Sequence, residues 1–206
     1  MCEAMSGIIA ADRIVRWSDT DESHYTIVIQ HKLHEGPSYR VGGANFVAYE
    51  YSPPDRDFRL PLDQWVYRVD DAFPLPDWYD EAECKALALE ALPKWIAQKI
   101  VLPGESREVT NGHIVACYGS VVARDSSHVV ARNSSRVDAR DSSHVVAWDS
   151  SHVDAINDSA TIQAYTAFDL AALKSPQAVL IDRTRDVPVC YVGVQKPKRA
   201  RAKKSE

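Results

Sequence analysis

Residues 121–160 read VVARDSSH, VVARNSSR, VDARDSSH, VVAWDSSH and VDAINDSA in five consecutive octapeptides. A fixed short period is the signature of a solenoid, in which each repeat packs on its neighbours. Eight extended residues span roughly 26 Å, too little to close a ring around a packed interior. Two octapeptides, or sixteen residues, are therefore predicted to form each coil of a flattened, two-faced β-solenoid.

The even repeat length keeps side-chain alternation in phase from one octapeptide to the next. The first and third positions are predicted to point inward, at Val121, Ala123, Val129, Ala131, Val137, Ala139, Val145, Ala147, Val153 and Ala155. Asp or Asn at the fifth position tolerates the backbone angles of a turn and can bond its own backbone. The predicted turn residues are Asp125, Asn133, Asp141, Asp149 and Asn157.

Residues sixteen apart are predicted to stack about one strand spacing, roughly 4.8 Å, from each other. One outward face then carries a mixed, mostly charged set: Val122, Arg124, Asp138, Arg140, Asp154 and Ile156. The opposite face is more apolar and is predicted to bind a partner through Val130, Arg132, Val146 and Trp148. Trp and Arg are favoured at interface hot spots. The alternative is that the N-terminal domain or the closing segment folds over this face.

The whole chain is predicted to be α+β, with four parts. These are an α+β head or cap domain (1–110), the octapeptide-repeat solenoid (111–170), a closing β-segment (171–195) and a disordered basic tail (196–206). In the head, residues 25–31 and 45–51 are β-branched and aromatic, and the Gly- and Pro-containing residues between them predict a hairpin or meander.

A helix is predicted after Asp77 or Asp80, either of which can cap its first turn. Its apolar face is Cys84, Leu87, Ala88, Ala91, Leu92, Trp95 and Ile96. Pro93 lies within this pattern and is expected to kink or break the helix. The head is also expected to cover the first coil, because the open sheet edges at a solenoid end need a cap.

Charge is distributed unevenly along the 206 residues. The tail 196–206 has six basic residues and one acid, so it carries +5, and the other 195 residues carry -5 - 5 = -10. An acidic body does not suit a phosphate backbone, so nucleic acid is an expected partner only for the tail. No apolar run is long enough to span a membrane, and the N-terminus lacks the pattern of a signal peptide, which predicts a cytoplasmic protein.

No catalytic residue, metal site or cofactor is predicted. Cys2, Cys84, Cys117 and Cys190 are scattered singly, without the spacing of a zinc site, and free thiols are expected. His31 and His34 would ligate a metal only on a helix, and this segment resembles a strand end. The acidic residues Asp19, Asp21 and Glu22 are interpreted as a solvated turn.

The Asp, Ser and His of each DSSH unit recur at identical corner positions rather than converging in a cleft, so a catalytic triad is not predicted. His128 and His144 are instead predicted to stack, as are Arg136 and His152. Protonation of such a ladder would lower stability at acid pH.

VVARDSSHVVARNSSR is similar to the octapeptide pattern of bacterial ice-nucleation proteins, although their outward Thr-x-Thr ladder is missing here. The layout of an α/β head, an AxxDSxxV-type array and a short closing strand resembles uncharacterised phage and prophage proteins. That resemblance implies a non-enzymatic protein that binds and inhibits a host defence protein, in the manner of an anti-CRISPR acting on a CRISPR effector subunit. This functional expectation rests on an analogy at the level of the fold.

Several alternatives stay open. The solenoid face also suits a homodimer. The head, with 11 basic and 19 acidic residues to position 108 (11 - 19 = -8), suits mimicry of nucleic acid. A competing class is an enzyme with its site in the head and the solenoid as scaffold, which a pocket of converging titratable side chains would favour. A third class is a structural or ice-interacting solenoid.

Overall fold

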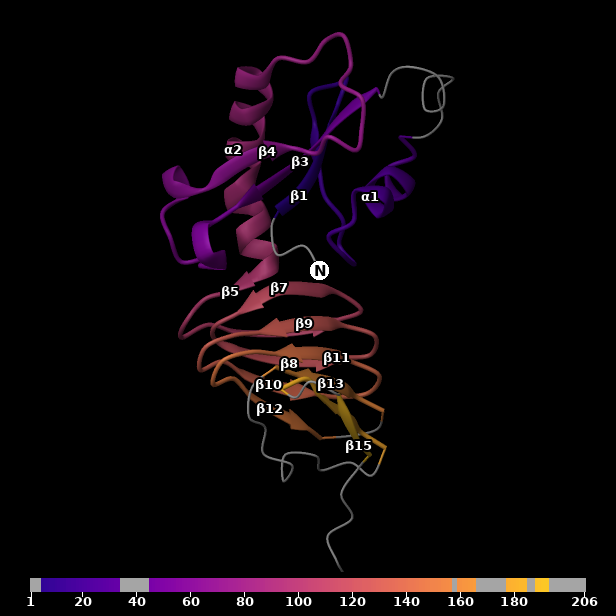
Figure 1. Ribbon diagram of the computed structural model, residues 1–206, viewed down its shortest axis with the longest axis vertical. Helices are drawn as coiled ribbons and strands as arrows, with labels where there is room; N and C mark the ends of the chain where they lie inside the picture. Colours follow the sequence, from indigo (N-terminus) through magenta and orange to yellow (C-terminus); the bar gives the residue numbers. More distant parts are fainter. Residues whose placement is uncertain (1–4, 34–44, 157–158, 166–176, 185–187, 193–206) are drawn as a thin grey trace, which may run out of the picture.

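The computed structural model describes residues 5–33, 45–156, 159–165, 177–184 and 188–192. A small α+β head stands on one end of a β-solenoid of about four turns, and the two share the long axis of the molecule (Figure 1). The predicted α+β class is confirmed. None of the described helices is long and apolar enough to cross a membrane. Cys2, His34, Asn157 and the basic tail lie outside the described residues.

The head is built on an antiparallel sheet with strand order β2-β1-β3-β4. Its strands are β1 (Met5–Ala10), β2 (Val15–Arg16), β3 (Phe46–Ser52) and β4 (Val66–Val69), and two 3-10 turns, Pro54–Arg56 and Leu62–Gln64, precede β4. All six residues of β1 are buried, because Met5 and Ile9 pack on the side of α2 while Ile8 packs on the side of α1. The sheet is thus covered on both faces.

The predicted helix is α2 (Glu81–Lys99), and the Asp80 carboxylate caps it by accepting the Glu83 N–H at 2.8 Å. Its buried side chains on the predicted apolar face are Cys84, Ala88, Leu92 and Trp95, and Lys99, which was not predicted there, is also buried. The expected break at Pro93 is wrong, since the helix is continuous through it. Pro93 lies on the exposed side of the helix, away from the packed face.

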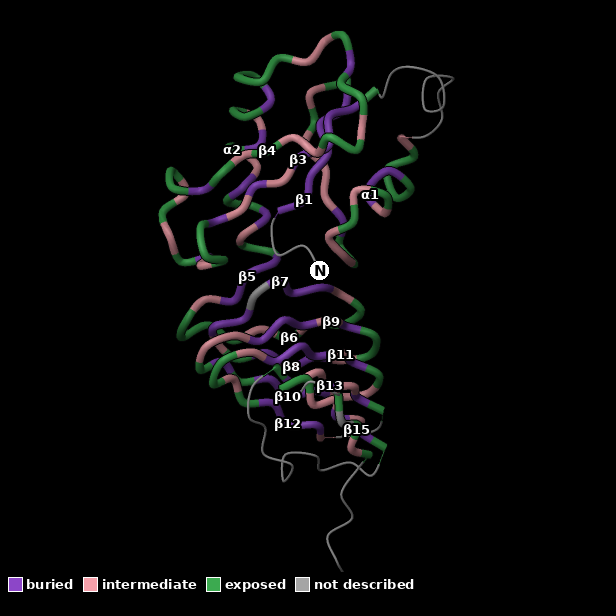
Figure 2. The backbone as a smooth tube through the Cα atoms, viewed as in Figure 1, coloured by how far each residue is buried: buried purple, intermediate pink, exposed green. Residues whose placement is uncertain are grey.

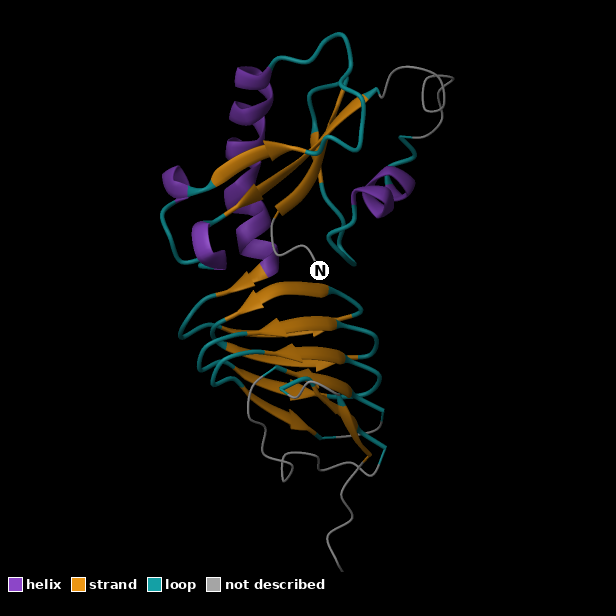
Figure 3. Ribbon diagram, in the orientation of Figure 1, coloured by secondary structure: helices purple, strands orange, loops and turns teal. Residues whose placement is uncertain are grey.

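The strand predicted at residues 25–31 is also wrong. This segment forms α1 (His24–Gln30), visible as a helix in Figure 3. A strand would place the adjacent Ile27 and Val28 on opposite faces, whereas both are buried in one cluster against β1. Burial of this pair outweighs the β-propensity of the segment. The predicted turn residues 36–43 lie outside the described part of the chain.

The solenoid consists of two facing sheets that the chain enters alternately, and all of their strand pairs are parallel except the last, β14 with β15. One contains β6 (Ser106–Thr110), β8 (Ser120–Arg124), β10 (Arg136–Ala139) and β12 (His152–Ala155). The other contains β5 (Ile100–Val101), β7 (His113–Cys117), β9 (His128–Ala131), β11 (His144–Ala147), β13 (Thr161–Ala164), β14 (Val179–Asp182) and β15 (Val189–Val192). The first coil thus includes strands that precede the octapeptides.

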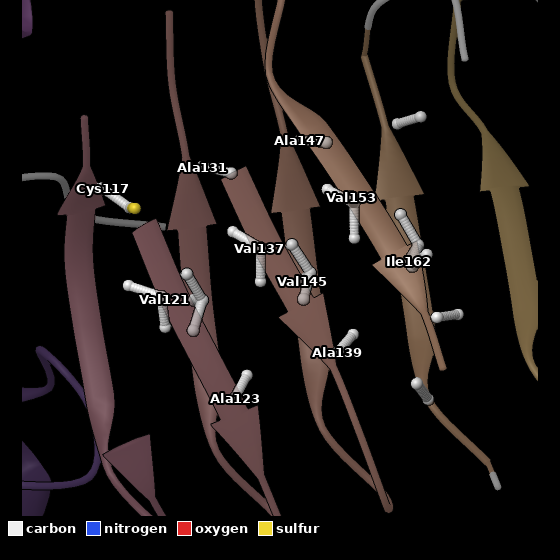
Figure 4. Close-up of a cluster of buried hydrophobic side chains, with 14 of the residues drawn as sticks. Cys117, Val121, Ala123, Ala131, Val137, Ala139, Val145, Ala147, Val153 and Ile162 are labelled. Carbon is white, nitrogen blue, oxygen red and sulfur yellow. The ribbon is translucent and has the colours of Figure 1, made fainter. Parts of the chain in front are cut away.

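The sixteen-residue coil is confirmed by the register. Val121 pairs with Val137 and Val137 with Val153 in one sheet, while Val129 pairs with Val145 in the other. All ten predicted inward side chains are at most 2% exposed and form one cluster between the sheets (Figure 4). Valine and alanine alternate along each strand, so the sheets approach closely around small side chains.

The corners are turned by the predicted Asp and Asn residues. Asp125, Asn133, Asp141 and Asp149 have φ between 49° and 58°, the left-handed region that Asp and Asn tolerate. Two of the carboxylates also join coils, since Asp141 Oδ2 accepts the Asp125 N–H at 3.2 Å and Asp149 Oδ2 accepts the Asn133 N–H at 3.1 Å. The turns at Asp125 and Asn133 are therefore held by the next coil as well as by their own backbone.

The two ends of the solenoid are closed differently. At the far end β14 pairs parallel to β13, and β15 turns back antiparallel to β14. At the near end Val115 and Tyr118 of the first coil belong to the core of the head, and Tyr118 Oη accepts the Phe58 N–H at 3.3 Å. The head therefore caps the solenoid as predicted, and Figure 2 shows buried backbone continuing across the junction.

Candidate functional site

Two arrangements of side chains qualify as candidate sites: the predicted partner-binding face of the solenoid and a cavity at the junction with the head. On the face, β9 and β11 lie side by side and bring Val130 into register with Val146. Both valines are buried, with 0% and 4% of their surface exposed. These two side chains therefore offer a partner almost no surface.

Arg132 and Trp148 keep exposed surface, since both are only partly buried. Each directly follows its strand and continues the ladder, because the Trp148 N–H donates to Ala131 O at 2.9 Å. The Arg132 guanidinium lies 5.7 Å from the centre of the Trp148 ring. This geometry is a cation–π contact, the pairing that the sequence places on this face.

Tyr165 extends this pair by one rung. Its ring stacks on Trp148 with centroids 4.1 Å apart and planes 6° from parallel, and Tyr165 is 38% exposed. We call Arg132, Trp148 and Tyr165 the aromatic–arginine column. Tyr165 is not predicted from the sequence because it follows Trp148 by seventeen residues, one more than the sixteen-residue period. Arg183 continues the same register on the far side of Tyr165.

The opposite face is charged, as predicted, and its groups are joined by ion pairs. Arg124 contacts Glu108 at 2.6 Å, and Arg136 contacts Asp154 at 3.1 Å. Arg136 and His152 are in register, and Asp154 is only 4% exposed. These charges are therefore largely committed to one another within the chain.

The predicted histidine ladder is present and longer than expected. His128 and His144 rings lie 4.9 Å apart, and His113 of the first coil stacks on His128 at the same distance. Burial lowers the pKa of His113 to about 3 and that of His128 to about 4, and the next histidine in the stack adds to each shift. The ladder is therefore neutral at physiological pH and ends at the head.

Glu22 of the head faces the end of this ladder. Its Oε1 lies 3.6 Å from His113 Nδ1, and the two side chains are only 4% and 3% exposed. Glu22 Oε2 accepts the Ser6 N–H at 3.3 Å. Burial raises the pKa of Glu22 to about 8, against the effect of the nearby Lys99 charge, so the carboxyl holds a proton at neutral pH. The solvated turn predicted around Glu22 is wrong for this residue.

His24 lies beside Glu22 at the start of α1. Its Nδ1 is 2.9 Å from Asp70 Oδ2, and its Nε2 is 2.9 Å from Tyr49 O. Both partners are acceptors, so each contact is a hydrogen bond when the ring nitrogen that faces it carries a proton. Three segments of the head and two coils of the solenoid thus bring titratable groups to one place.

A cavity of about 510 Å³ opens here, and its lining is Asp21, Glu22, Ser23, His24, Tyr25, Glu50, Asp70, His113 and His128. We call it the junction cavity. Within the described part of the chain, no three His, Cys, Asp or Glu side chains converge as metal ligands. The three cysteines there, Cys84, Cys117 and Cys190, are free thiols, the first two buried. His31 stands on the helix C-cap and approaches Trp17 O.

No protein-family model, curated protein or solved structure matches this chain. The junction cavity is not predicted from the sequence, because its lining residues are spread from Asp21 to His128 and belong to both the head and the solenoid. One partial signal is present: a count of one coil upstream from His128 arrives at Gly112 (128 - 16 = 112), one residue short of His113.

Proposed function

We propose that this chain is a non-enzymatic binding protein that uses the solenoid to occupy and block a protein of a host defence complex. The observation that carries the proposal is the aromatic–arginine column. Trp148 and Tyr165 form a flat stacked surface 4.1 Å apart, and Arg132 adds a cation to it. Aromatic and arginine side chains that are rigid before binding lose little entropy when a partner docks.

The choice of a defence protein rests on the resemblance of the repeat and layout to phage and prophage proteins, among them anti-CRISPR-type inhibitors. A steric inhibitor needs a rigid surface and no chemistry, and parallel coils joined by turn carboxylates supply rigidity. The exposed part of the column suits a partner surface that carries carboxylates beside an apolar patch.

An affinity pull-down from bacterial lysate containing defence systems, read by mass spectrometry, tests the proposal. We expect one stoichiometric protein partner that is retained at moderate salt. Arg132→Glu and Trp148→Glu should each reduce capture at least about tenfold. Arg140→Glu is a matched control, because Arg140 has the same place in its octapeptide but lies on the opposite face. Recovery of the bait alone, or equal capture by all variants, contradicts the proposal.

A second copy of this chain is the alternative occupant of the column. Sedimentation at increasing concentration distinguishes it, since a dimer formed through the column would dissociate in the Trp148→Glu variant. A monomer at all concentrations leaves the column to a different protein.

An enzyme is the second candidate function, and the junction cavity favours it. The cavity collects a buried acid, a paired histidine and two stacked neutral histidines, and shifted pKa values in a cleft are typical of active sites. A structural or ice-interacting role would need a regular outward ladder, whereas the outward positions here vary from coil to coil.

A further inference from the structure

The junction cavity contains buried polar atoms that the described residues leave without hydrogen bonds. Glu22 Oε1, His113 Nδ1 and His113 Nε2 are each buried and have no hydrogen-bond partner. The 3.6 Å between Glu22 Oε1 and His113 Nδ1 is too long for a hydrogen bond. Buried polar groups are nearly always paired, so an unpaired acid and imidazole on the wall of a cavity indicate a ligand.

The charge of the lining defines the class of that ligand. Four of the described lining residues are carboxylic acids, namely Asp21, Glu22, Glu50 and Asp70, and none is Lys or Arg. Asp70 is occupied by His24, and Asp21 accepts from Ser23 N and Thr26 Oγ1. Glu22 and Glu50 are therefore the acids available to a ligand, which favours a cation.

The shape of the site favours an organic cation over a metal ion. Ligating side chains do not converge among the described residues, and about 510 Å³ is the volume of a small-molecule site. Tyr25 is 62% exposed and lines the same cavity, where an aromatic face attracts ammonium groups.

We propose that the junction cavity binds a small organic cation with ammonium groups, such as a linear diamine, seated against the carboxylates of Glu22 and Glu50. The junction cavity is separate from the aromatic–arginine column, so this proposal does not depend on partner binding through the column. It uses both halves of the molecule, since Glu22 and Glu50 belong to the head and His113 to the first coil.

Binding should be coupled to release of a proton. The groups that face Glu22 are Asp21 on its own loop, Lys99 on α2, and His113 and His128 on the solenoid. Burial keeps Glu22 protonated below about pH 8 because its raised pKa reflects the cost of an unpaired buried carboxylate. An ammonium group removes that cost, so the carboxyl ionises when the ligand binds. Affinity should then rise about tenfold per pH unit up to about pH 8.

Isothermal titration calorimetry of the full chain with putrescine tests this, performed at neutral pH in two buffers of different ionisation enthalpy. We expect one saturable site and release of about one proton, seen as a difference in heat between the buffers. Glu22→Gln should weaken binding at least about tenfold and abolish the proton release. Glu50→Gln should weaken binding but retain the proton release, because the titrating acid is still present.

Asp63→Asn is the matched control, since Asp63 is an exposed acid of the head outside the cavity, and it should bind like the parent chain. Circular dichroism should show Glu22→Gln folded, because glutamine has the size and neutrality of the protonated acid. Unchanged affinity in a folded Glu22→Gln chain overturns the proposal. So does the lack of any heat up to about 10 mM putrescine, or preferential binding of Mg²⁺ or inorganic phosphate.

Discussion

The head and the solenoid bury their apolar side chains in opposite ways. The solenoid core is made of valine and alanine at fixed positions, each packed on an equivalent residue one coil away. The head core is made of large aromatic side chains from distant segments, such as Phe58, Trp65 and Trp95. One core is local and repetitive, and the other is long-range and unique. The two cores should therefore respond differently to substitution. The junction cavity lies where they meet.

Trp95→Ala should have the largest effect on stability. Trp95 is fully buried, with ring centroids 6.2 Å from Phe58 and 6.5 Å from Trp65. Its removal is expected to cost about 4 kcal/mol, and Leu89→Ala on the exposed side of the same helix below about 0.5 kcal/mol. Hydrogen exchange should speed up in the head while β9 to β12 remain protected. Equal loss of protection in both parts would show that the two cores unfold as one.

Val121→Asn and Val122→Asn form a matched pair on β8. Val121 points between the sheets and is 2% exposed, whereas its neighbour Val122 points outward and is half-buried. The inward amide loses apolar burial and has no hydrogen-bond partner, so we expect a cost of about 3 kcal/mol, against less than about 1 kcal/mol outward. Urea unfolding measures both. Similar costs at the two positions would contradict the sixteen-residue coil.

Stability should vary with pH in opposite directions on the two sides of the junction. The pKa values of His113 and His128 are lowered in the folded chain. Below about pH 6.5 the unfolded chain therefore binds protons that the folded chain does not bind, so stability falls as pH drops. The raised pKa of Glu22 means that the folded chain keeps a proton up to about pH 8, so stability falls as pH rises above about 4.5.

The three histidines of lowered pKa outweigh the one acid below about pH 6.5, and the acid outweighs them above it, so maximum stability is expected near pH 6.5. The lowered pKa of Lys99 acts against the acid at more alkaline pH. Each group contributes a slope of about 1.4 kcal/mol per pH unit. Urea unfolding between about pH 5 and pH 8 checks this. Glu22→Gln should flatten the alkaline side and His113→Gln should reduce the acid slope; a flat profile in the parent chain would contradict the buried, neutral pair.

Asp141→Ala should destabilise the chain less than Trp95→Ala or Val121→Asn. It removes the carboxylate that accepts the Asp125 N–H, and it places alanine at a φ of 53°. We expect a loss of about 1 to 2 kcal/mol, and a smaller loss for Asp141→Asn, since asparagine keeps an acceptor and tolerates this angle. Thermal unfolding compares them. A more stable alanine variant would show that the cross-coil bond contributes nothing.

The contrast between the two cores also explains what the sequence predicts. In the solenoid, a count of sixteen residues identifies each neighbour in the adjacent coil. The inward positions, the four described turn residues and the adjacency of His128 and His144 are therefore predicted correctly, although these two rings meet edge to face rather than stacked. The sixteen-residue period is interrupted between Ile156 and Thr161, so it does not predict the position of Tyr165. It is also interrupted before Val121, so it does not predict the position of His113. An irregularity of one residue is therefore enough to prevent the sequence from predicting which side chains stack.

In the head, local pattern is a weaker guide. The α2 apolar face and its Asp80 cap are correct because they depend on spacing within one segment. The strand predicted where α1 forms is wrong because packing against β1 sets the conformation of this segment. Local composition does not encode that packing. Glu22 and His113 are 91 residues apart in sequence (113 - 22), and their contact depends on how the head packs on the solenoid. No local signal in the sequence therefore specifies it.

The most direct test of the central claim is hydrogen exchange of this chain with and without its captured partner. A partner bound through the aromatic–arginine column should slow exchange at the ends of β9, β11 and β13, around Arg132, Trp148 and Tyr165, and leave the head sheet unchanged. Protection confined to the acidic head, with the column exchanging freely, would contradict the claim and assign the decisive contact to the head.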